Sequence, residues 1–411
     1  MANSNDKSQK KRIKVAVIAN EFFELYQGRM GGFGWATRQV TNYFNSNSNL
    51  GIDVVLIAGE TYGKSGEPDP IVHNTRLILR QGNKLEYIRR IWAEKIDLIL
   101  SIDYRPNYRP LFWILPKTPI VLWGRDPRPP EDVVKIETVR IPGVENVYPQ
   151  GLKCYDCSSF AQVVRVSKLL GRSVLFATPT PFLKEKVPGT YGVKPSEVTF
   201  LPNIIDMEPA EVVKSEKPTV VFLARLDPYK RPWLFAEIAR HFPDVEFIFM
   251  GKPHFQGKGA WQPTSLPDNV KLMGHVGEED KIRILSQAWV LINTSIHEGL
   301  PVSFQESLKC ETPILSCLDP ENVVSQFGIY VGRYDGTGME GIPKFIEGLK
   351  TLLENHELRT KLGKEGRKWV SKTHNQDNFQ KVFSDLCKNQ KSINFQRLRN
   401  NYELQINSRR R

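Results

Sequence analysis

Cysteine is scarce in this sequence: 411 residues contain five, at positions 154, 157, 310, 317 and 387. An odd, sparse set argues against a disulfide-stapled secreted domain and favours a reducing compartment, so we expect a cytoplasmic protein. Only Cys154 and Cys157 have CxxC spacing. A structural zinc site needs four ligands, and no second CxxC or nearby His pair supplies them. We interpret the two as ordinary thiols, with metal or redox use as the alternative.

Long apolar runs are also missing. No run of eighteen or more apolar residues occurs, which predicts the absence of a membrane-spanning helix. The opening MANSNDKSQKKRIK is polar and basic and has no apolar stretch after its charges. It therefore does not read as a secretory signal. We expect residues 1–11 to form a disordered basic tail.

Acidic residues are too few to balance the basic ones, and the net charge is +12. Residues 1–200 hold 28 Lys and Arg against 19 Asp and Glu, whereas residues 201–411 hold 29 against 26. This excess indicates an acidic partner, either a phosphorylated acceptor or an anionic membrane surface reached as a peripheral protein from the cytoplasm. A merely solubilising charge is an equal alternative. We expect no nucleic-acid partner, because no recognition module accompanies the charge.

Short apolar runs alternate with helical patterns through both halves of the chain. The runs predict strands at 13–20, 52–59, 96–102, 119–123, 172–178, 218–226, 245–251, 289–295 and 312–317. The intervening patterns predict helices that include 82–94, 158–170, 230–241, 278–287, 302–310, 342–354, 357–372 and 375–388. This alternation is typical of an α/β protein built from doubly wound parallel sheets.

The alternation breaks at LPNIIDMEPAEVVKSEKP (201–218), which is rich in proline and charge. We interpret this stretch as a linker between two Rossmann-like domains, residues 12–205 and 206–374. Residues 375–411 are expected to be a helix that returns to the first domain, followed by a basic tail. Ligands of such sheets bind at the carboxyl ends of the strands, so two facing domains predict a cleft between them.

Three motifs fall at those strand ends. In MGGFG, Gly31 and Gly32 stand between a strand and a helix, where backbone N–H groups can approach a phosphate, although a tight turn is the alternative. In ARLDPYKRP, Arg225 and Lys230 offer two cations at the ligand edge, which suits a diphosphate but is also compatible with a surface ion pair.

The third motif is HEGLPVSFQE (297–306), where Glu298 and Glu306 flank the entrance of a predicted helix. Free N–H groups of residues 300–303 would make an anion site there. Carboxylates accept hydrogen bonds from hydroxyls, so a diphosphate with sugars on both sides fits this spacing. A capping glutamate beside a solvated one is the alternative. We expect His297 to have a structural role.

These motifs together resemble the retaining glycosyltransferases of family 4, the glycogen-synthase-like group 1 enzymes with the GT-B fold. That family has two glutamates separated by seven residues, here E-GLPVSFQ-E, and a strand ending G-R-[LM]-x-x-x-K, here ARLDPYK. LPNIID is similar to its PNGVD linker, MGGFG to its first-domain loop and KLMGHV to its base-binding strand. The resemblance covers roughly residues 13–387.

The resemblance implies a metal-independent hexosyl transfer from a UDP-, GDP- or ADP-sugar to a polysaccharide or lipid-linked glycan, with no other cofactor. Residues 12–205 would bind the acceptor and residues 206–374 the donor. Glu306 would bind the ribose and Glu298 the transferred sugar, while Arg225 and Lys230 would hold the diphosphate. The remaining donor contacts would come from Gly31, Gly32, Gly251, His275, Gly299, Leu300 and Val302.

This sequence departs from the family's pattern at one point: many members carry a histidine before an aspartate in the first domain. Here VLWGRDPRPP places Arg125 at that position and keeps Asp126, which would contact the acceptor or act as a weak base; a turn residue is the alternative. Arg125 and Arg128 would hold an anionic acceptor. A nucleotide-sugar epimerase and a catalytically weak or inactive sugar-nucleotide-binding subunit remain as rival functions.

Overall fold

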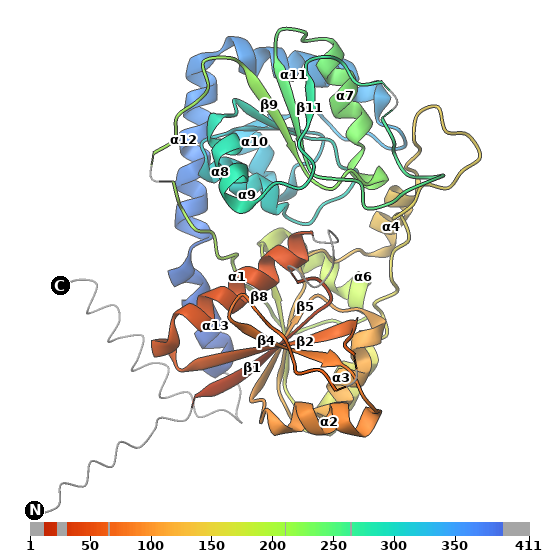
Figure 1. Cartoon of the computed structure of the whole chain (residues 1–411), viewed down its shortest axis with the longest axis vertical. Coiled ribbons are helices and arrows are strands. Elements are labelled where there is room, and N and C mark those ends of the chain that lie inside the picture. Colours follow the sequence, from red (N-terminus) through yellow and green to blue (C-terminus); the bar gives the residue numbers. More distant parts are fainter. Residues whose placement is uncertain (1–11, 23–30, 65, 210, 264, 389–411) are drawn as a thin grey trace, which may run out of the picture.

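The computed structural model describes residues 12–22, 31–64, 66–209, 211–263 and 265–388. The basic tail expected at residues 1–11 and the tail after residue 388 lie outside this range. Within it, the strands form two separate sheets, one above the other in Figure 1. No helix in the described part of the chain is long and apolar enough to cross a membrane.

The first sheet has eight strands among the described residues, in the order β3-β4-β2-β1-β5-β6-β7-β8. Its strands are β1 (Ile13–Ala19), β2 (Ile52–Tyr62), β3 (Ile71–Val72), β4 (Thr75–Arg80), β5 (Leu98–Ile102), β6 (Ile120–Trp123), β7 (Val174–Thr178) and β8 (Val198–Phe200). All pair in parallel except β3 with β4. Its helices are α1 (Gly32–Ser46), α2 (Lys84–Ala93), α3 (Arg109–Ile114), α4 (Pro130–Glu137), α5 (Phe160–Leu169) and α6 (Val187–Tyr191).

The second sheet has six parallel strands among the described residues, in the order β11-β10-β9-β12-β13-β14. These strands are β9 (Thr219–Leu223), β10 (Glu246–Met250), β11 (Val270–Leu272), β12 (Val290–Asn293), β13 (Ile314–Ser316) and β14 (Gly328–Tyr330). The helices are α7 (Pro232–Arg240), α8 (Glu278–Gln287), α9 (Val302–Lys309), α10 (Val323–Phe327), α11 (Ile342–Glu354), α12 (His356–Thr373) and α13 (Gln376–Lys388). The predicted parallel α/β architecture is confirmed.

Helix α13 packs on the first sheet's side of the molecule, although it follows the second sheet in the chain (Figure 1). Phe383 lies 5.1 Å from Phe44 of α1 between ring centroids, and Tyr43 donates a hydrogen bond of 2.6 Å to Gln380. Both phenylalanines are almost fully buried. Burying an aromatic side chain contributes about 1.5–3 kcal/mol, so these rings anchor α13 on α1.

The passage from the first sheet to the second near residue 203 and the return near residue 374 lie side by side. The backbone N–H of Asn203 donates to Nδ1 of His374 at 3.1 Å, and the N–H of Ile205 donates to the His374 carbonyl at 3.0 Å. Both Asn203 and His374 are buried. The two passages therefore form one hydrogen-bonded connection.

A segment of the first half also belongs to the second core. After α4, residues 138–152 reach the second sheet's side of the molecule, where Gln150 donates its N–H to the Gly259 carbonyl at 2.7 Å. Four apolar side chains from the end of α4 and this segment join the second core, namely Ile136, Val139, Ile141 and Leu152. A domain boundary drawn only at residue 205 misses this exchange, because the sequence there has no strong helical or strand period.

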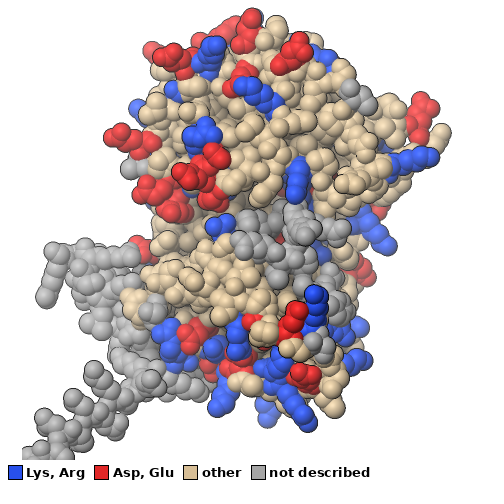
Figure 2. Space-filling view, viewed as in Figure 1, with Lys and Arg blue, Asp and Glu red and all other residues tan. Residues whose placement is uncertain are grey.

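Figure 2 shows how charge is distributed over one face of the molecule. Acidic side chains gather on the upper part, over α8, whose first turn contains Glu278, Glu279 and Asp280. Near the lower end, Lys and Arg side chains lie with acidic ones between them. This face does not present a continuous basic surface.

Candidate functional site

Arg225 lies two residues beyond the end of β9, at the carboxyl edge of the second sheet. Its guanidinium is 3.2 Å from an Asp227 carboxylate oxygen, donates to the Tyr229 hydroxyl at 3.0 Å and lies 3.2 Å from Nδ1 of His254. Burial alone would lower the pKa of Arg225, but Tyr229 and Asp227 beside it raise that pKa above its usual value. The site therefore holds a permanent, oriented cation.

Lys230 and Glu298 form an ion pair at the same edge, and each side chain is 12% exposed. Burial would lower the pKa of Lys230, but Glu298 outweighs burial and raises it. Ser295 donates to Oε1 of Glu298 at 2.7 Å, and this is the oxygen that Lys230 contacts. Asn293 reaches the same oxygen at 3.5 Å, so the hydrogen-bond donors among the described residues all meet Oε1 of Glu298.

A fully buried arginine holds the loop that carries Glu298. Arg231 has a left-handed backbone, with φ of 49°. Its guanidinium donates to the carbonyl oxygens of Thr294 at 2.8 Å, Tyr334 at 2.6 Å and Ser295 at 3.3 Å. This fixes residues 294–295 next to Lys230, so the ion pair rests on a rigid support.

Helix α9 begins at Val302, and Pro301 is its N-cap residue. Glu306 is buried one turn further along and forms an ion pair of 2.5 Å with Lys281 of α8. Gln305 accepts a hydrogen bond of 2.7 Å from Asn203 at the connection between the sheets. The first turn of α9 includes Val302, while Leu300 in the preceding loop is buried.

The glycine loop of the first sheet faces these groups from the other side. A Cβ on Gly31 would lie 3.7 Å from Cζ of Arg225, and a Cβ on Gly32 would lie 3.6 Å from Cγ2 of Val302. The start of α1 therefore meets both Arg225 and the start of α9. Glu21 occupies this point, because its carboxylate accepts from the N–H groups of Gly31 at 3.0 Å and Gly34 at 3.2 Å.

Gly251 and His275, both predicted to contact the donor, follow the neighbouring strands. Gly251 has φ of 150°, and a Cβ there would lie 1.9 Å from the Ala224 carbonyl oxygen, so only glycine fits beside the backbone that leads to Arg225. Its N–H donates to the Gly274 carbonyl at 2.7 Å. His275 is exposed, next to this contact.

His297 and Asp126 join the two halves of the molecule. Nε2 of His297 lies 2.8 Å from Oδ1 of Asp126, and Nε of Arg128 donates to Oδ2 of Asp126 at 2.9 Å. Burial alone would raise the pKa of Asp126, but Arg128 and His297 hold it well below its usual value. The carboxylate of Asp126 is thus engaged by one partner from each half of the molecule, and its predicted role as an acceptor contact or weak base stays a prediction.

Arg125, which the sequence predicted to hold an anionic acceptor, is engaged within the protein. It is buried, donates to Oδ1 of Asn203 at 2.7 Å and lies over the Trp123 ring at 4.5 Å. Gly299 passes close to it, since a Cβ on Gly299 would lie 2.3 Å from the Arg125 carbonyl oxygen. Arg125 therefore ties the two halves together beside Glu298 instead of offering a charge to a ligand.

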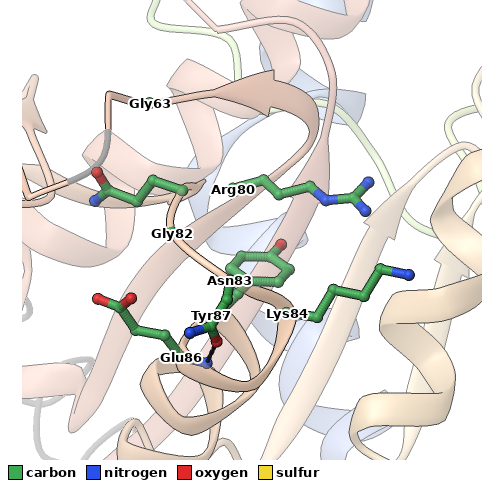
Figure 3. Close-up of a pocket in the computed structure, with 8 residues that line it drawn as sticks. Gly63, Arg80, Gly82, Asn83, Lys84, Glu86 and Tyr87 are labelled. Atoms are coloured by element: carbon green, nitrogen blue, oxygen red, sulfur yellow. Dashed lines mark hydrogen bonds between the residues drawn. The ribbon is translucent and has the colours of Figure 1, made fainter.

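A separate pocket of about 650 Å³ lies at the carboxyl ends of β2 and β4. Its lining is Gly63, Arg80, Gln81, Gly82, Asn83, Lys84, Glu86 and Tyr87. Figure 3 shows Arg80 and Lys84 extending to one side and Glu86 to the other. Asn83 caps α2 by accepting from the Glu86 N–H at 2.9 Å. The lining therefore holds charges of both signs at this edge of the first sheet.

The CxxC cysteines do not form a site. Cys157 donates to the Tyr104 carbonyl at 3.2 Å, and burial raises the pKa of its thiol to about 12. All five cysteines are free. In the part of the chain that the structure describes, no three His, Cys, Asp or Glu side chains cluster as metal ligands.

The structure thus brings several of the predicted donor residues next to one another: Gly31 with Arg225, Gly32 with Val302, Lys230 with Glu298, and Gly251 with the backbone before Arg225. Glu306 lies in the helix that begins at Val302, and Gly299 and Leu300 lie in the loop before it. The structure adds Glu21, Tyr229, Ser295 and Lys281, which the sequence did not single out. Tyr229 stood inside the ARLDPYK motif and could have been noticed. Glu21 and Lys281 gave no signal, because their partners are set by tertiary contacts.

Residues 204–369 match the protein family described as "Glycosyl transferases group 1". The chain is 22% identical over 169 residues to glycosyltransferase 1 domain-containing protein 1 of Xenopus tropicalis, a match that covers 39% of this chain and 47% of that protein. It therefore spans about half the length of this curated relative.

Solved structures are similar over most of the chain. Sucrose-phosphate synthase from Thermosynechococcus elongatus superposes with a TM-score of 0.67 at 16% identity, covering 92% of this chain and 98% of that one. HepE from Anabaena, solved in complex with UDP-glucose, gives 0.64 at 12% identity, covering 92% and 100%. These likenesses establish the GT-B fold.

Proposed function

We propose that this protein is a retaining glycosyltransferase that transfers a hexosyl unit from a nucleotide-diphosphate sugar to a polysaccharide or lipid-linked glycan. One observation carries the proposal: Arg225, Lys230 and Glu298 converge with the starts of α1 and α9 at the point where the two sheets face each other. The group 1 match and the GT-B fold support the same class of enzyme.

The charges at this point suit a departing nucleotide diphosphate. In the transfer, the bond between C1 of the sugar and the phosphate oxygen breaks, and the diphosphate leaves with the electron pair. Arg225 and Lys230 would stabilise its charge together with the free N–H groups at the start of α9. These cations supply the charge that a divalent ion supplies elsewhere, so we propose metal-independent transfer.

Glu298 would hold the transferred sugar. Its Oε1 is bound by Lys230 and Ser295, so Oε2 can accept from a sugar hydroxyl. When a diphosphate draws Lys230 toward itself, the carboxylate gains further accepting capacity. Because Asp126 is held as an ion-paired carboxylate, the acceptor proton would pass to the leaving phosphate oxygen, while the acceptor oxygen bonds to C1 on the same face.

Glu21 must yield its position when a donor binds. Its carboxylate fills the N-terminus of α1 beside Arg225, where a phosphate would otherwise accept the same N–H groups. Two anions cannot share these donors, so the Glu21 side chain would rotate away on binding.

Calorimetric titration without metal tests the proposal. UDP, GDP, ADP and their hexose conjugates are titrated into the wild type and into Glu306→Ala, with the exposed Glu279→Ala as a matched control. We expect one nucleotide class to bind and Glu306→Ala to weaken it about tenfold or more, since a hydrogen bond to a charged group is lost. Binding of none of them by the wild type would refute a nucleotide-sugar enzyme, and binding without sugar transfer would favour the inactive-subunit alternative.

The acceptor and the location stay predictions of the sequence. We propose a cytoplasmic enzyme whose acceptor is anionic, and the excess of Lys and Arg over Asp and Glu supports an acidic partner. Sedimentation with anionic and neutral vesicles tests the peripheral membrane attachment. Equal binding to both vesicle types, or none, would argue against it.

A further inference from the structure

Lys281 is a buried cation that neither the family match nor the predicted site explains. Its helix α8 opens with three acidic residues, yet Lys281 points inward and its side chain is 11% exposed. Its ammonium group lies 2.5 Å from Oε1 of Glu306 and 3.1 Å from Oε2 of Glu278. Burial would lower the pKa of Lys281, but Glu306 and Glu278 outweigh it and raise that pKa, so the lysine stays charged.

The contact with Lys281 occupies one carboxylate oxygen of Glu306 and leaves the other oxygen without a donor among the described residues. Among the described residues Lys281 is the hydrogen-bond donor to Glu306, and it takes Oε1. A carboxylate can accept about four hydrogen bonds in total, so Oε2 and part of Oε1 remain for a ligand. Without Lys281, a carboxyl group that is only 5% exposed would lose its counter-charge and the contact that fixes its orientation.

An exposed ion pair on the same helix provides a comparison for Lys281. Arg283 pairs with Asp280 at 2.8 Å, and the two side chains are 56% and 63% exposed. Such a pair contributes little to stability. Lys281 differs in burial and in its partner, because it bridges from α8 to α9 at the residue expected to meet the ribose.

We propose that Lys281 is a positioning residue that orients Glu306 toward the 2′- and 3′-hydroxyls of the donor nucleotide, and so sets the preference for ribonucleotide over 2′-deoxyribonucleotide donors. The inference rests on the proposed function. It deepens that function by assigning the sugar discrimination of the site to a pair of side chains, Lys281 and Glu306.

The test compares the affinity of the preferred nucleoside diphosphate with that of its 2′-deoxy counterpart. The wild type is expected to favour the ribonucleotide by about tenfold or more, as a hydrogen bond to a charged acceptor implies. Lys281→Met is expected to bring this ratio close to one, mainly by weakening the ribonucleotide. Lys281→Arg should restore most of the ratio, and Arg283→Met should leave it unchanged.

The possible outcomes distinguish an error about Lys281 from an error about the proposed function. If Lys281→Met weakens both nucleotides equally and keeps the ratio, Lys281 serves only the overall charge or structure and the inference is wrong. If the wild type binds no nucleotide, the proposed function itself is wrong. Should Lys281→Met lose its fold by circular dichroism, Lys281→Leu, which also removes the N–H donor and the charge, carries the same comparison.

Discussion

His374 provides a quantitative test of the connection between the two sheets. Its Nδ1 accepts from the Asn203 N–H at 3.1 Å, and its side chain is 1% exposed. Burial, assisted by the charge of Arg125, lowers its pKa to about 3. A proton on Nδ1 would face a backbone N–H, so the folded protein keeps this ring neutral.

The direction of the pH effect follows from this difference. An unfolded histidine has a pKa of about 6.5, so below that value the unfolded chain binds the proton more tightly than the folded protein. Stability is therefore complete above about pH 6.5 and is lost as the pH falls toward 3. At 1.36 kcal/mol for each pKa unit, the loss approaches about 5 kcal/mol at low pH and reaches about 2 kcal/mol at pH 5.

Urea unfolding followed by tryptophan fluorescence measures this loss. The free energies of unfolding of the wild type and His374→Gln are compared at pH 7.5 and pH 5, with the exposed His356→Gln as control. We expect the difference between wild type and His374→Gln to change by about 2 kcal/mol between the two pH values, and the control to follow the wild type. A difference that stays constant with pH would show that the folded protein does not hold His374 neutral.

Three further predictions concern the site. Gly251→Ala should destabilise the protein by about 3 kcal/mol or more, because a Cβ there would lie 1.9 Å from a carbonyl oxygen. Gly277→Ala is the control, since a Cβ there meets nothing within 4 Å, and equal melting temperatures for the two variants would contradict the prediction. Arg231→Met should cost about 3–5 kcal/mol in urea unfolding, since it leaves buried carbonyl groups unpaired, and a change below about 1 kcal/mol would count against its supporting role. Asp126→Asn should keep the shape of the pH–rate profile of nucleotide release, because Arg128 and His297 hold the pKa of Asp126 well below its usual value; a variant profile that loses an acidic limb present in the wild type would show that Asp126 acts as a base.

Much of the fold could be predicted because its strands are buried on both faces and read as continuous apolar runs. The same signal failed for β4, TRLILR, whose two arginines are exposed and interrupt the run. It also failed for β8 and β14, which are three residues long. Short edge strands carry too few apolar residues to show a period.

The candidate site was predictable where one motif contained both partners, as with Arg225 and Tyr229. It was not predictable where partners come from distant segments. Asp126 and His297 are 171 positions apart, so nothing in VLWGRDPRPP indicated that a histidine of the second half would reach its aspartate. The pairing of Lys281 with Glu306 depends on how α8 packs on α9, which a single sequence does not encode in a visible pattern.

The exchange of segments between the two cores has a consequence for how the protein is made. The second core needs Ile136, Val139, Ile141 and Leu152 from the first half, and the first needs α13, which is synthesised after the second sheet. At about 1.5–3 kcal/mol each, the four aliphatic side chains amount to roughly 6–12 kcal/mol, comparable to the whole stability of a domain. A fragment containing only the matched residues 204–369 should therefore expose apolar surface and aggregate, and a nascent chain should reach its native packing only after α13 has left the ribosome.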